Sequence, residues 1–242
     1  MTRSKHALRI SPVLALAALL LAGVAGLAGS SRAAEESRVI PAYAGEAQPA
    51  EASEEVAVLA GGCFWGVQGV FQHTKGVLSA VSGYAGGEKQ TARYETVGTG
   101  ATGHAETVRV TFDPKQISYE KILQIYFSVA HDPTQLNRQG PDTGTQYRSA
   151  IFPTSPEQAK TAKAYIDQLN QARVFNAAIV TKIEPNKSFY PAELYHQDFM
   201  TLNPRHPYIV VNDQPKVEDL KRIFPDLYRD DPVLVTKAKT AG

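Results

Sequence analysis

The sequence is poor in two things that many proteins use for chemistry and for partner binding: cysteine and net charge. It contains one cysteine, Cys63, among 242 residues. A single cysteine excludes an intrachain disulfide and any zinc site built from several thiolates. The 25 Lys and Arg residues nearly balance the 24 Asp and Glu residues. No basic excess is therefore present to hold a phosphate backbone, and we expect no nucleic-acid partner.

Long apolar runs are confined to the N-terminus. Three basic residues among the first nine precede a charge-free run from Ser11 to Ser31, and a small-residue site, Ser31-Arg32-Ala33, follows. This order is typical of a secretory signal peptide, so we assign residues 1–33 to one and expect an exported protein, periplasmic or secreted. If the segment stays uncleaved, its length suits a membrane anchor. Cleavage removes four basic residues and no acidic one, which leaves a mildly acidic chain.

Composition divides the rest of the chain into three parts. Residues 34–54 mix Ala, Glu and Pro with few large apolar residues. We expect them to form a flexible leader, because such a segment cannot bury enough surface to become ordered. Residues 55–230 carry the periodic patterns of a folded domain, and residues 231–242 form a C-terminal tail.

Strand and helix patterns alternate through the folded part. A buried strand at 56–60 leads into a helix at 63–73 with its apolar residues on one face. The alternation at 106–112 predicts a strand with one buried face and antiparallel neighbours. Ser118 and Ser155 are suitable N-caps for two helices. The remaining predictions are strands at 77–84, 149–152 and 178–183 and helices at 118–130, 155–171, 191–200 and 217–228. Together these patterns indicate a compact α+β domain with a mixed sheet.

A glycine-rich segment matches a nucleotide-binding motif by letter. Gly98-Thr-Gly-Ala-Thr-Gly103 fits G-x-G-x-x-G, but that motif binds a pyrophosphate only where a strand precedes it and a helix follows. A strand is predicted to follow here, so we interpret the glycines as a loop. The histidines after the signal peptide lack the short spacing of a metal site, and we expect neither a metal nor a bound cofactor.

The local context of Cys63 favours a reactive thiol. A lone cysteine is more often a small buried apolar residue than a nucleophile. Cys63, however, follows Gly61-Gly62, which leave space above the sulfur. It also begins a helix, whose N-terminus we expect to lower the pKa of the thiol. Phe64 and Trp65, the only Trp in the chain, follow directly. A thiolate beside two aromatic rings indicates nucleophilic chemistry on a small apolar group.

Four segments carry a resemblance to a known family. Gly62-Cys-Phe-Trp-Gly66 resembles the active-site motif of the A-type peptide methionine sulfoxide reductases. Gly103-His-Ala-Glu106 and Asp142-Thr-Gly-Thr-Gln-Tyr-Arg-Ser149 are similar to two further motifs of that family, and Tyr94 stands where the family has a pocket tyrosine. The resemblance runs from about residue 56 to residue 228. With it we expect a ferredoxin-like (αβ plait) core with helices packed on the sheet and an extended C-terminal tail.

The resemblance implies an enzyme that uses a thiol to reduce methionine S-sulfoxide, in peptides and also free, to methionine. Cys63 would attack the sulfoxide sulfur and become a sulfenic acid. Glu106 would protonate the oxygen, which requires burial that raises its pKa. The other site residues implied form two groups: Tyr94, Tyr147 and Asp142 around the oxygen, and Phe64, Trp65 and His196 around the methyl group.

The C-terminal region departs from many members of the family, which carry resolving cysteines there. Residues 207–242 contain none, so the chain resembles the single-cysteine branch. An external thiol would then have to reduce Cys63, directly or through a mixed disulfide. We expect a thioredoxin-like protein or a small dithiol in this role, and a monomeric enzyme.

Other interpretations of the same residues stay open at this point. Apart from the resemblance, Glu106 suits a solvated strand position, Tyr94 and Tyr147 suit packing positions, and Asp142 suits a turn. A cysteine hydrolase would also place Cys63 at a helix start, with a histidine base and an asparagine further along the chain. The candidates for these two roles are His104, His131 or His196, and Asn203. A redox sensor, in which Cys63 is oxidised without turnover, is a third reading.

Overall fold

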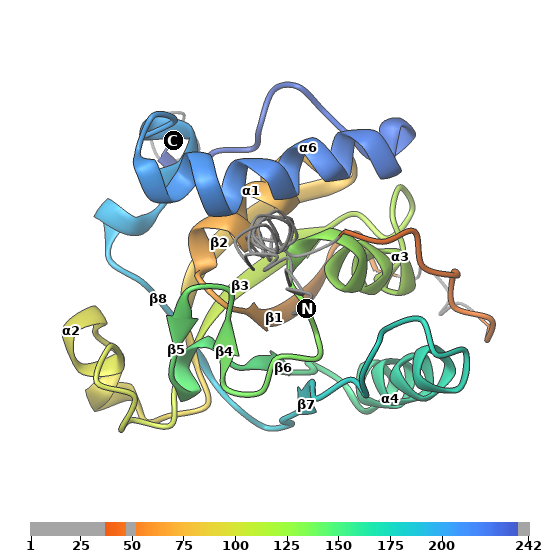
Figure 1. Cartoon of the computed structure of the whole chain (residues 1–242), viewed down its shortest axis with the longest axis horizontal. Helices are drawn as coiled ribbons and strands as arrows, with labels where there is room; N and C mark the ends of the chain where they lie inside the picture. Colours follow the sequence, from red (N-terminus) through yellow and green to blue (C-terminus); the bar gives the residue numbers. More distant parts are fainter. Residues whose placement is uncertain (1–36, 47–51, 237–242) are drawn as a thin grey trace, which may run out of the picture. The chain divides into compact units, whose positions relative to one another are not determined.

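A six-stranded mixed sheet forms the centre of the computed structural model, which describes residues 37–46 and 52–236. The strand order is β7-β6-β1-β3-β2-β8, and Figure 1 shows the helices packed around this sheet. Three long strands form the middle of the sheet: β1 (Glu55–Gly61), β2 (Val77–Ala85) and β3 (Ala105–Phe112). β3 lies between β1 and β2 and is antiparallel to both. The outer strands are β6 (Ser149–Ile151), β7 (Lys182–Ile183) and β8 (Phe189–Pro191), and β6 pairs with β7 in parallel. The predicted α+β class with a mixed sheet is confirmed.

The helices begin where the sequence places their caps. Ser118 Oγ accepts a hydrogen bond from the Lys121 N–H (3.3 Å), and Ser155 Oγ accepts one from the Gln158 N–H (3.1 Å). The longer helices are α1 (Phe64–Gln72), α3 (Tyr119–Ile125), α4 (Pro156–Gln171) and α6 (Gln214–Ile223), and the short ones are α2 (Tyr94–Val97) and α5 (Phe199–Leu202). π-helical turns at Tyr126–Ala130 and Ile209–Asp213 extend α3 and precede α6. A small ribbon pairs β4 (Arg138–Gln139) with β5 (Asp142–Thr143).

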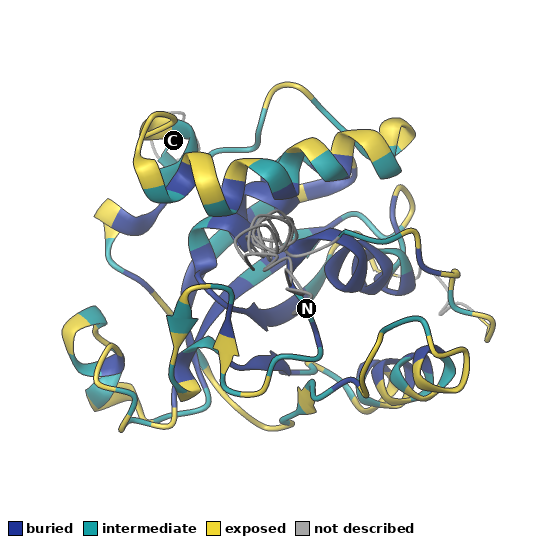
Figure 2. Ribbon diagram, in the orientation of Figure 1, coloured by how far each residue is buried: buried dark blue, intermediate teal, exposed yellow. Residues whose placement is uncertain are grey.

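The main core lies between the helices and one face of the sheet. In Figure 2 the central strands are dark blue, whereas α4 and α6 carry exposed residues on their outer faces. Val108, Val110 and Phe112 of β3 belong to this core together with the apolar side of α1. Glu106 precedes Val108 by two residues and so shares its face of the strand. It is 3% exposed, and the interpretation of Glu106 as a solvated residue is wrong.

Residues 37–46 depart from the predicted flexible leader. Ile40 is buried in the main core, and its carbonyl oxygen accepts a hydrogen bond from Gln124 Nε2 (2.8 Å). The Tyr165 hydroxyl donates to the Pro41 carbonyl oxygen (2.7 Å). The prediction is wrong for this part, because Ile40 and Tyr43 pack against the core and side chains of the domain hydrogen-bond to the backbone of the segment. Residues 34–36 and 47–51 lie outside the described residues, as does the predicted signal peptide, 1–33.

Two predicted elements are shorter or different. The helix expected at 191–200 is replaced by the end of β8, a 3₁₀ turn at Leu194–His196 and α5. Asp198 interrupts it with a left-handed backbone (φ 57°). The strand expected at 178–183 is reduced to β7, because the N–H groups of Ile179 and Val180 donate to Asn170 Oδ1 and the Pro133 carbonyl oxygen instead of a neighbouring strand. The glycine-rich segment 98–103 is a loop between α2 and β3, as predicted.

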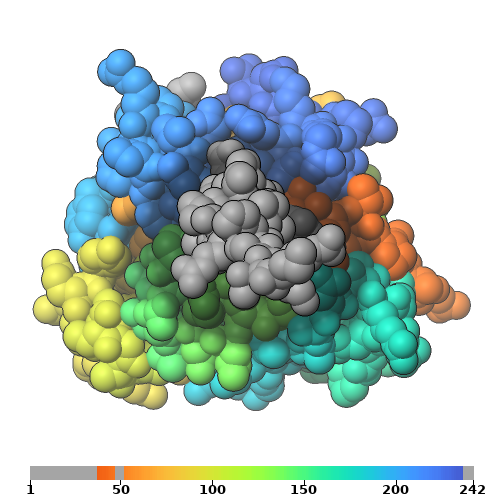
Figure 3. Space-filling model, viewed as in Figure 1, coloured from red at the N-terminus to blue at the C-terminus, as the bar shows by residue number. Residues whose placement is uncertain are grey.

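The last described residues are tied into the domain. The buried Asp198 carboxylate accepts hydrogen bonds from the N–H groups of Val235 (3.0 Å) and Thr236 (2.9 Å) and from Gln72 Nε2 (2.6 Å). In the space-filling view the blue C-terminal region forms a continuous band along the top (Figure 3). No helix within 37–46 and 52–236 has the length and apolar character that crossing a membrane requires.

Candidate active site

Cys63 lies at the sharp turn from β1 into α1, for which it is the N-cap residue. Gly62 makes this turn with φ +84°, and the Gln139 side chain occupies the space where a Cβ would be. A residue other than glycine at 62 would therefore be strained in its backbone and would collide with its neighbour. The Cys63 side chain accepts no capping hydrogen bond from α1. The thiol nevertheless lies at the N-terminus of the helix, as the sequence predicts, and the Trp65 backbone N–H lowers its pKa.

A pocket of about 270 Å³ contains this thiol. Seven of the eight site residues inferred from the sequence line it, although they come from α1, α2, β3, β5 and the 3₁₀ turn at Thr145–Tyr147. They are Cys63, Phe64, Trp65, Tyr94, Glu106, Asp142 and Tyr147. The fold therefore brings together residues up to 84 positions apart in the sequence. The eighth inferred site residue, His196, lies behind the pocket wall.

The Glu106 carboxyl is the acidic group of the pocket. Its Oε2 atom accepts a hydrogen bond from the Phe64 backbone N–H (3.0 Å). Burial raises the pKa of Glu106 to about 8; the charges of Asp142 and Asp213 act in the same direction, and the Phe64 N–H opposes them. Glu106 is therefore largely protonated at neutral pH and can donate a proton.

The thiol itself is not the ready thiolate that the sequence predicts. Burial raises the pKa of the Cys63 thiol well above its ordinary value, and the negative charges of Glu106 and Asp213 raise it further. The Trp65 N–H and the charge of Lys216 act in the opposite direction and are outweighed. The expectation of a lowered thiol pKa is wrong for the free protein, because desolvation exceeds the effect of a helix N-terminus.

Three tyrosine hydroxyls complete the polar side of the pocket. Burial raises the pKa of Tyr94, Tyr147 and Tyr208, so all three are hydrogen-bond donors at neutral pH. The Tyr208 hydroxyl donates to Asp142 Oδ2. The Tyr94 backbone N–H donates to Glu193 Oε1 (3.0 Å), which anchors the start of α2.

The aromatic side of the pocket is centred on Trp65. Its Nε1–H donates to His196 Nδ1 (3.2 Å), and its ring stacks on Phe199 at a centroid distance of 3.8 Å. The His196 ring also contacts the rings of Phe64 (5.1 Å) and Tyr94 (4.3 Å). Burial lowers the pKa of His196, which keeps the ring neutral and able to accept. His196 thus supports the wall from behind, whereas the sequence placed it in the pocket.

Sequence reasoning missed two lining residues, His206 and Tyr208. Both contact the Trp65 ring edge to face, at 6.1 and 5.9 Å. No periodicity or motif distinguishes them in the sequence. Their place in the site results from tertiary packing of the segment after α5 against α1.

The histidines considered as bases for a hydrolase do not line this pocket. His104 accepts from the Gly87 N–H (3.2 Å) and contacts the Glu88 carbonyl oxygen (3.0 Å), so it joins two loops. His131 is buried against the Ser149 hydroxyl (2.7 Å). With His196 behind Trp65, none of the three faces the sulfur from the pocket. Asn203 is likewise absent from the lining.

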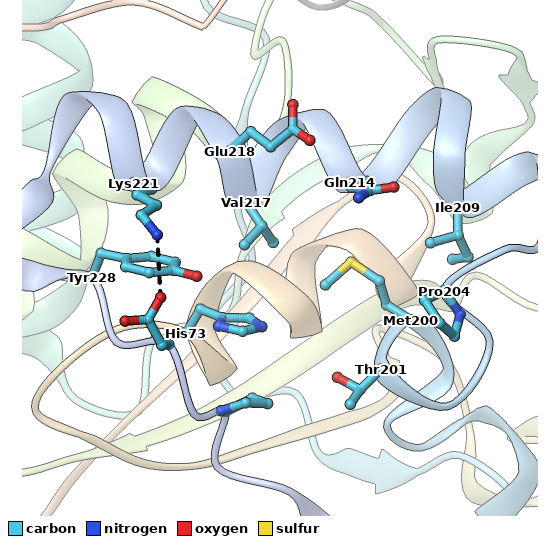
Figure 4. A pocket seen from close by; sticks show the side chains of 12 residues that line it. His73, Met200, Thr201, Pro204, Ile209, Gln214, Val217, Glu218, Lys221 and Tyr228 are labelled. Carbon is cyan, nitrogen blue, oxygen red and sulfur yellow. Dashed lines mark hydrogen bonds and ion pairs between the residues drawn. The ribbon is translucent and has the colours of Figure 1, made fainter.

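A larger hollow of about 500 Å³ lies elsewhere, between α1, α5 and α6 (Figure 4). Lys221 forms an ion pair with Asp230 (3.2 Å) across the Tyr228 ring. The lining of this hollow includes His73, Met200 and Val217 but none of the site residues inferred from the sequence. The site residues inferred from the sequence therefore gather at the smaller pocket.

A buried thiol, a protonated carboxyl and an aromatic wall in one pocket define a thiol-dependent enzyme with its own proton donor. Comparison with known proteins specifies the family. Residues 55–227 match the family described as peptide methionine sulfoxide reductase. The chain is 63% identical over 191 residues to peptide methionine sulfoxide reductase MsrA 2 of Mesorhizobium japonicum, a match that covers 79% of this chain and 98% of that protein. It is 47% identical over 207 residues to MsrA 2 of Synechocystis sp., covering 84% and 97%.

Solved structures agree. The reduced form of Mxr1 from Saccharomyces cerevisiae matches with a TM-score of 0.59 and 33% identity, over 69% of this chain and 94% of that one. Methionine sulfoxide reductase A of Corynebacterium diphtheriae matches with a TM-score of 0.54 and 35% identity, over 66% and 78%. The chain belongs to the A-type peptide methionine sulfoxide reductase family. It is an oxidoreductase that reduces methionine sulfoxide in the repair of oxidised protein.

Proposed function

We propose that Cys63 attacks the sulfur of methionine S-sulfoxide while Glu106 protonates the departing oxygen. The observation that carries this mechanism is the buried Glu106 carboxyl, held by the Phe64 N–H in the same pocket as the thiol and with a pKa of about 8. A carboxyl that is neutral near pH 7 is suited to donate a proton to an oxygen that gains negative charge.

The reaction balances with these groups alone. The sulfoxide oxygen takes a proton from Glu106, the Cys63 sulfur bonds to the substrate sulfur, and the Glu106 carboxylate takes up the proton that the thiol loses. The oxygen then passes to Cys63, which gives methionine and a sulfenic acid. The substrate sulfur is reduced by two electrons and the cysteine sulfur is oxidised by two. The raised pKa of the Cys63 thiol fits this order, because the proton is lost only when Glu106 becomes able to accept it.

The remaining pocket residues bind the two ends of the sulfoxide group. Tyr94 and Tyr147 donate hydrogen bonds to the oxygen, which stabilises the developing charge, and Asp142 orients the Tyr208 hydroxyl. Phe64 and Trp65 hold the methyl group through apolar and sulfur–aromatic contacts. His196 acts as a positioning residue, because it accepts the Trp65 indole N–H.

The second half of the cycle requires another molecule, since the chain has no second cysteine. Two external thiol groups reduce the sulfenic acid: one forms a mixed disulfide with Cys63 and releases water, and the other resolves it. A thioredoxin-like protein or a small dithiol fits this role. We also propose that peptide-bound and free methionine sulfoxide are both substrates and that the enzyme is a monomer.

For the fold we propose a ferredoxin-like plait at the core. The four strands β6-β1-β3-β2 are antiparallel neighbours, α1 connects β1 to β2, and α3 connects β3 to β6. This is the βαββαβ connectivity with strand order 4-1-3-2 that characterises the plait. β7 and β8 extend it at either edge.

We propose export as the location, on the strength of the basic start, the apolar run and the Ser31-Arg32-Ala33 site. N-terminal sequencing of the protein expressed at full length in a bacterium tests this. A mature chain that starts at Ala34 in the periplasmic fraction is expected. An intact Met1 in the cytoplasmic fraction would refute export, and an intact chain in the membrane fraction would indicate an anchor.

Cys63→Ser tests the nucleophile. Reduction of L-methionine S-sulfoxide and of a peptide that contains it should be lost with dithiothreitol as reductant, because serine is a far weaker nucleophile and cannot form a sulfenic acid. The R epimer serves as the control substrate, and wild-type protein should leave it unchanged. Retained turnover in Cys63→Ser would refute the mechanism. In the wild-type protein, a single oxidation of Cys63 with no further turnover in the presence of dithiothreitol would indicate a sensor.

A further inference from the structure

Two residues of opposite charge, Asp213 and Lys216, lie buried behind the first turn of α1. Asp213 ends the π-helical turn at 209–213 with its side chain fully buried, and Lys216, in the first turn of α6, has an 8% exposed side chain. The Lys216 Nζ and Asp213 Oδ1 atoms are 3.6 Å apart. Removing two charges from water is costly, so a buried pair is weak evidence for stability. Its position suggests a role in the site.

The pair contacts the turn that holds the nucleophile. Gly66 is the third residue of α1, and a Cβ at this position would overlap Asp213 Oδ1. The carboxylate therefore lies directly against the backbone of the turn that Cys63 caps. Gly66 has no left-handed backbone angle, so the close approach of Asp213 is what requires glycine here.

Lys216 acts on the same region from α6. Its charge lowers the pKa of Cys63 and also that of His131, which lies against Gly61 at the end of β1. His131 cannot share this positive role, because burial lowers its pKa to about 3 and keeps it neutral. Lys216 lies outside the lining of the pocket and supplies positive charge near the sulfur from α6.

We propose that Asp213 and Lys216 are positioning residues for the Cys63 nucleophile. The carboxylate fixes the first turn of α1 beneath the sulfur, and the ammonium group offsets the negative charge that Asp213 and Glu106 impose on it. The inference rests on the proposed role of Cys63.

The other charged and titratable groups around the sulfur do not supply this balance. Glu106 of β3 opposes the thiolate. Tyr94, Tyr147 and Tyr208 face Cys63 from α2, the 3₁₀ turn at 145–147 and the segment after α5, and they are neutral at working pH because their pKa values are raised. Asp142 adds a further negative charge beyond Tyr208. Without the charge of Lys216, we therefore expect only acidic and neutral groups around the thiol.

The test measures the rate at which iodoacetamide alkylates Cys63 between pH 6 and 10, which follows the thiolate fraction. Lys216→Met should raise the thiol pKa and slow alkylation at pH 8 by roughly tenfold, and Asp213→Asn should lower the pKa and accelerate it by roughly tenfold. Lys216→Arg keeps the charge and should alkylate at the wild-type rate. A purely structural role would loosen the turn in both variants and shift both rates in the same direction.

Lys221, near the C-terminal end of α6, and Asp230, in the segment after it, provide a matched control. They form an exposed ion pair (3.2 Å) outside the Cys63 pocket, and Lys221→Met and Asp230→Asn should leave the alkylation profile unchanged. Equal rates for Lys216→Met and wild type, or shifts of the same sign in Lys216→Met and Asp213→Asn, would overturn the proposal. If Asp213→Asn does not fold, the difference in alkylation rate between Lys216→Met and Lys216→Arg decides. Sulfoxide reduction by Cys63→Ser, measured alongside, separates a failure of this inference from a failure of the nucleophile assignment.

Discussion

In its proposed role as proton donor, Glu106 sets the pH range in which the site can protonate an oxygen. Its pKa of about 8 means that the carboxyl is neutral below that pH and charged above it. We predict that kcat falls as the pH rises through about 8 and that Glu106→Gln loses roughly 10²- to 10⁴-fold in kcat, because an amide cannot supply the proton. A pH–rate profile of both proteins measures this. Full activity of Glu106→Gln at pH 7 would show that the proton comes from elsewhere.

The same residue gives a control on folding. A carboxyl whose folded pKa is raised contributes stability that is complete below its ordinary pKa of 4.5 and is lost as the pH rises through about 8. Glu106→Gln should therefore be at least as stable as wild type at pH 9. Thermal unfolding at pH 5 and pH 9 checks this, and a variant that is unstable at both would make its activity uninformative.

His196 allows a test of the aromatic wall. His196→Leu removes the acceptor for the Trp65 indole N–H and leaves a half-buried donor unpaired, at a cost of about 1–3 kcal/mol. We predict a raised KM for the sulfoxide and a changed Trp65 emission, with a smaller change in kcat. His196→Asn can place an acceptor near Nδ1 and should remain closer to wild type. Equal KM values for His196→Leu and wild type would contradict the positioning role.

At the scale of elements, the segment 37–46 acts as part of the fold. Ile40 is 2% exposed, whereas its neighbour Val39 is 79% exposed. We predict that Ile40→Ala lowers the free energy of unfolding by about 2–5 kcal/mol, the usual cost of truncating a buried Ile. Val39→Ala is the matched control and should change it by less than about 0.5 kcal/mol. Urea unfolding measures both, and equal effects would show that the segment does not depend on Ile40.

The elements that the sequence predicts well are those whose signals are local. The caps Ser118 and Ser155 and the alternation of β3 describe short-range chemistry, and the structure has the helices and the strand there. The region after residue 190 is different, because Asp198 is left-handed and its carboxylate is committed to residues 235–236. Contacts between residues so far apart in the sequence produce no periodic pattern from which they could be predicted.

The same division applies to the site. Cys63 is marked by its neighbours in the chain, whereas Tyr208 and His206 enter the pocket by tertiary packing. The raised thiol pKa could not be predicted either, since it depends on burial and on the charges of Glu106 and Asp213. The sequence indicates a helix N-terminus at Cys63 but not how far its surroundings exclude water.

At the scale of the whole molecule, the single cysteine divides the proposed catalytic cycle between this chain and an external thiol. The pocket provides a thiol and an acid for the first step, and the chain has no second thiol for the next one. The protein without a reductant should therefore stop after one turnover. Intact mass spectrometry and Trp65 fluorescence after addition of L-methionine S-sulfoxide, with no thiol present, test this most directly. We predict one methionine released per protein, one added oxygen on Cys63 that dimedone traps, and a change in Trp65 emission. Release of methionine with no gain of oxygen on Cys63 would contradict it.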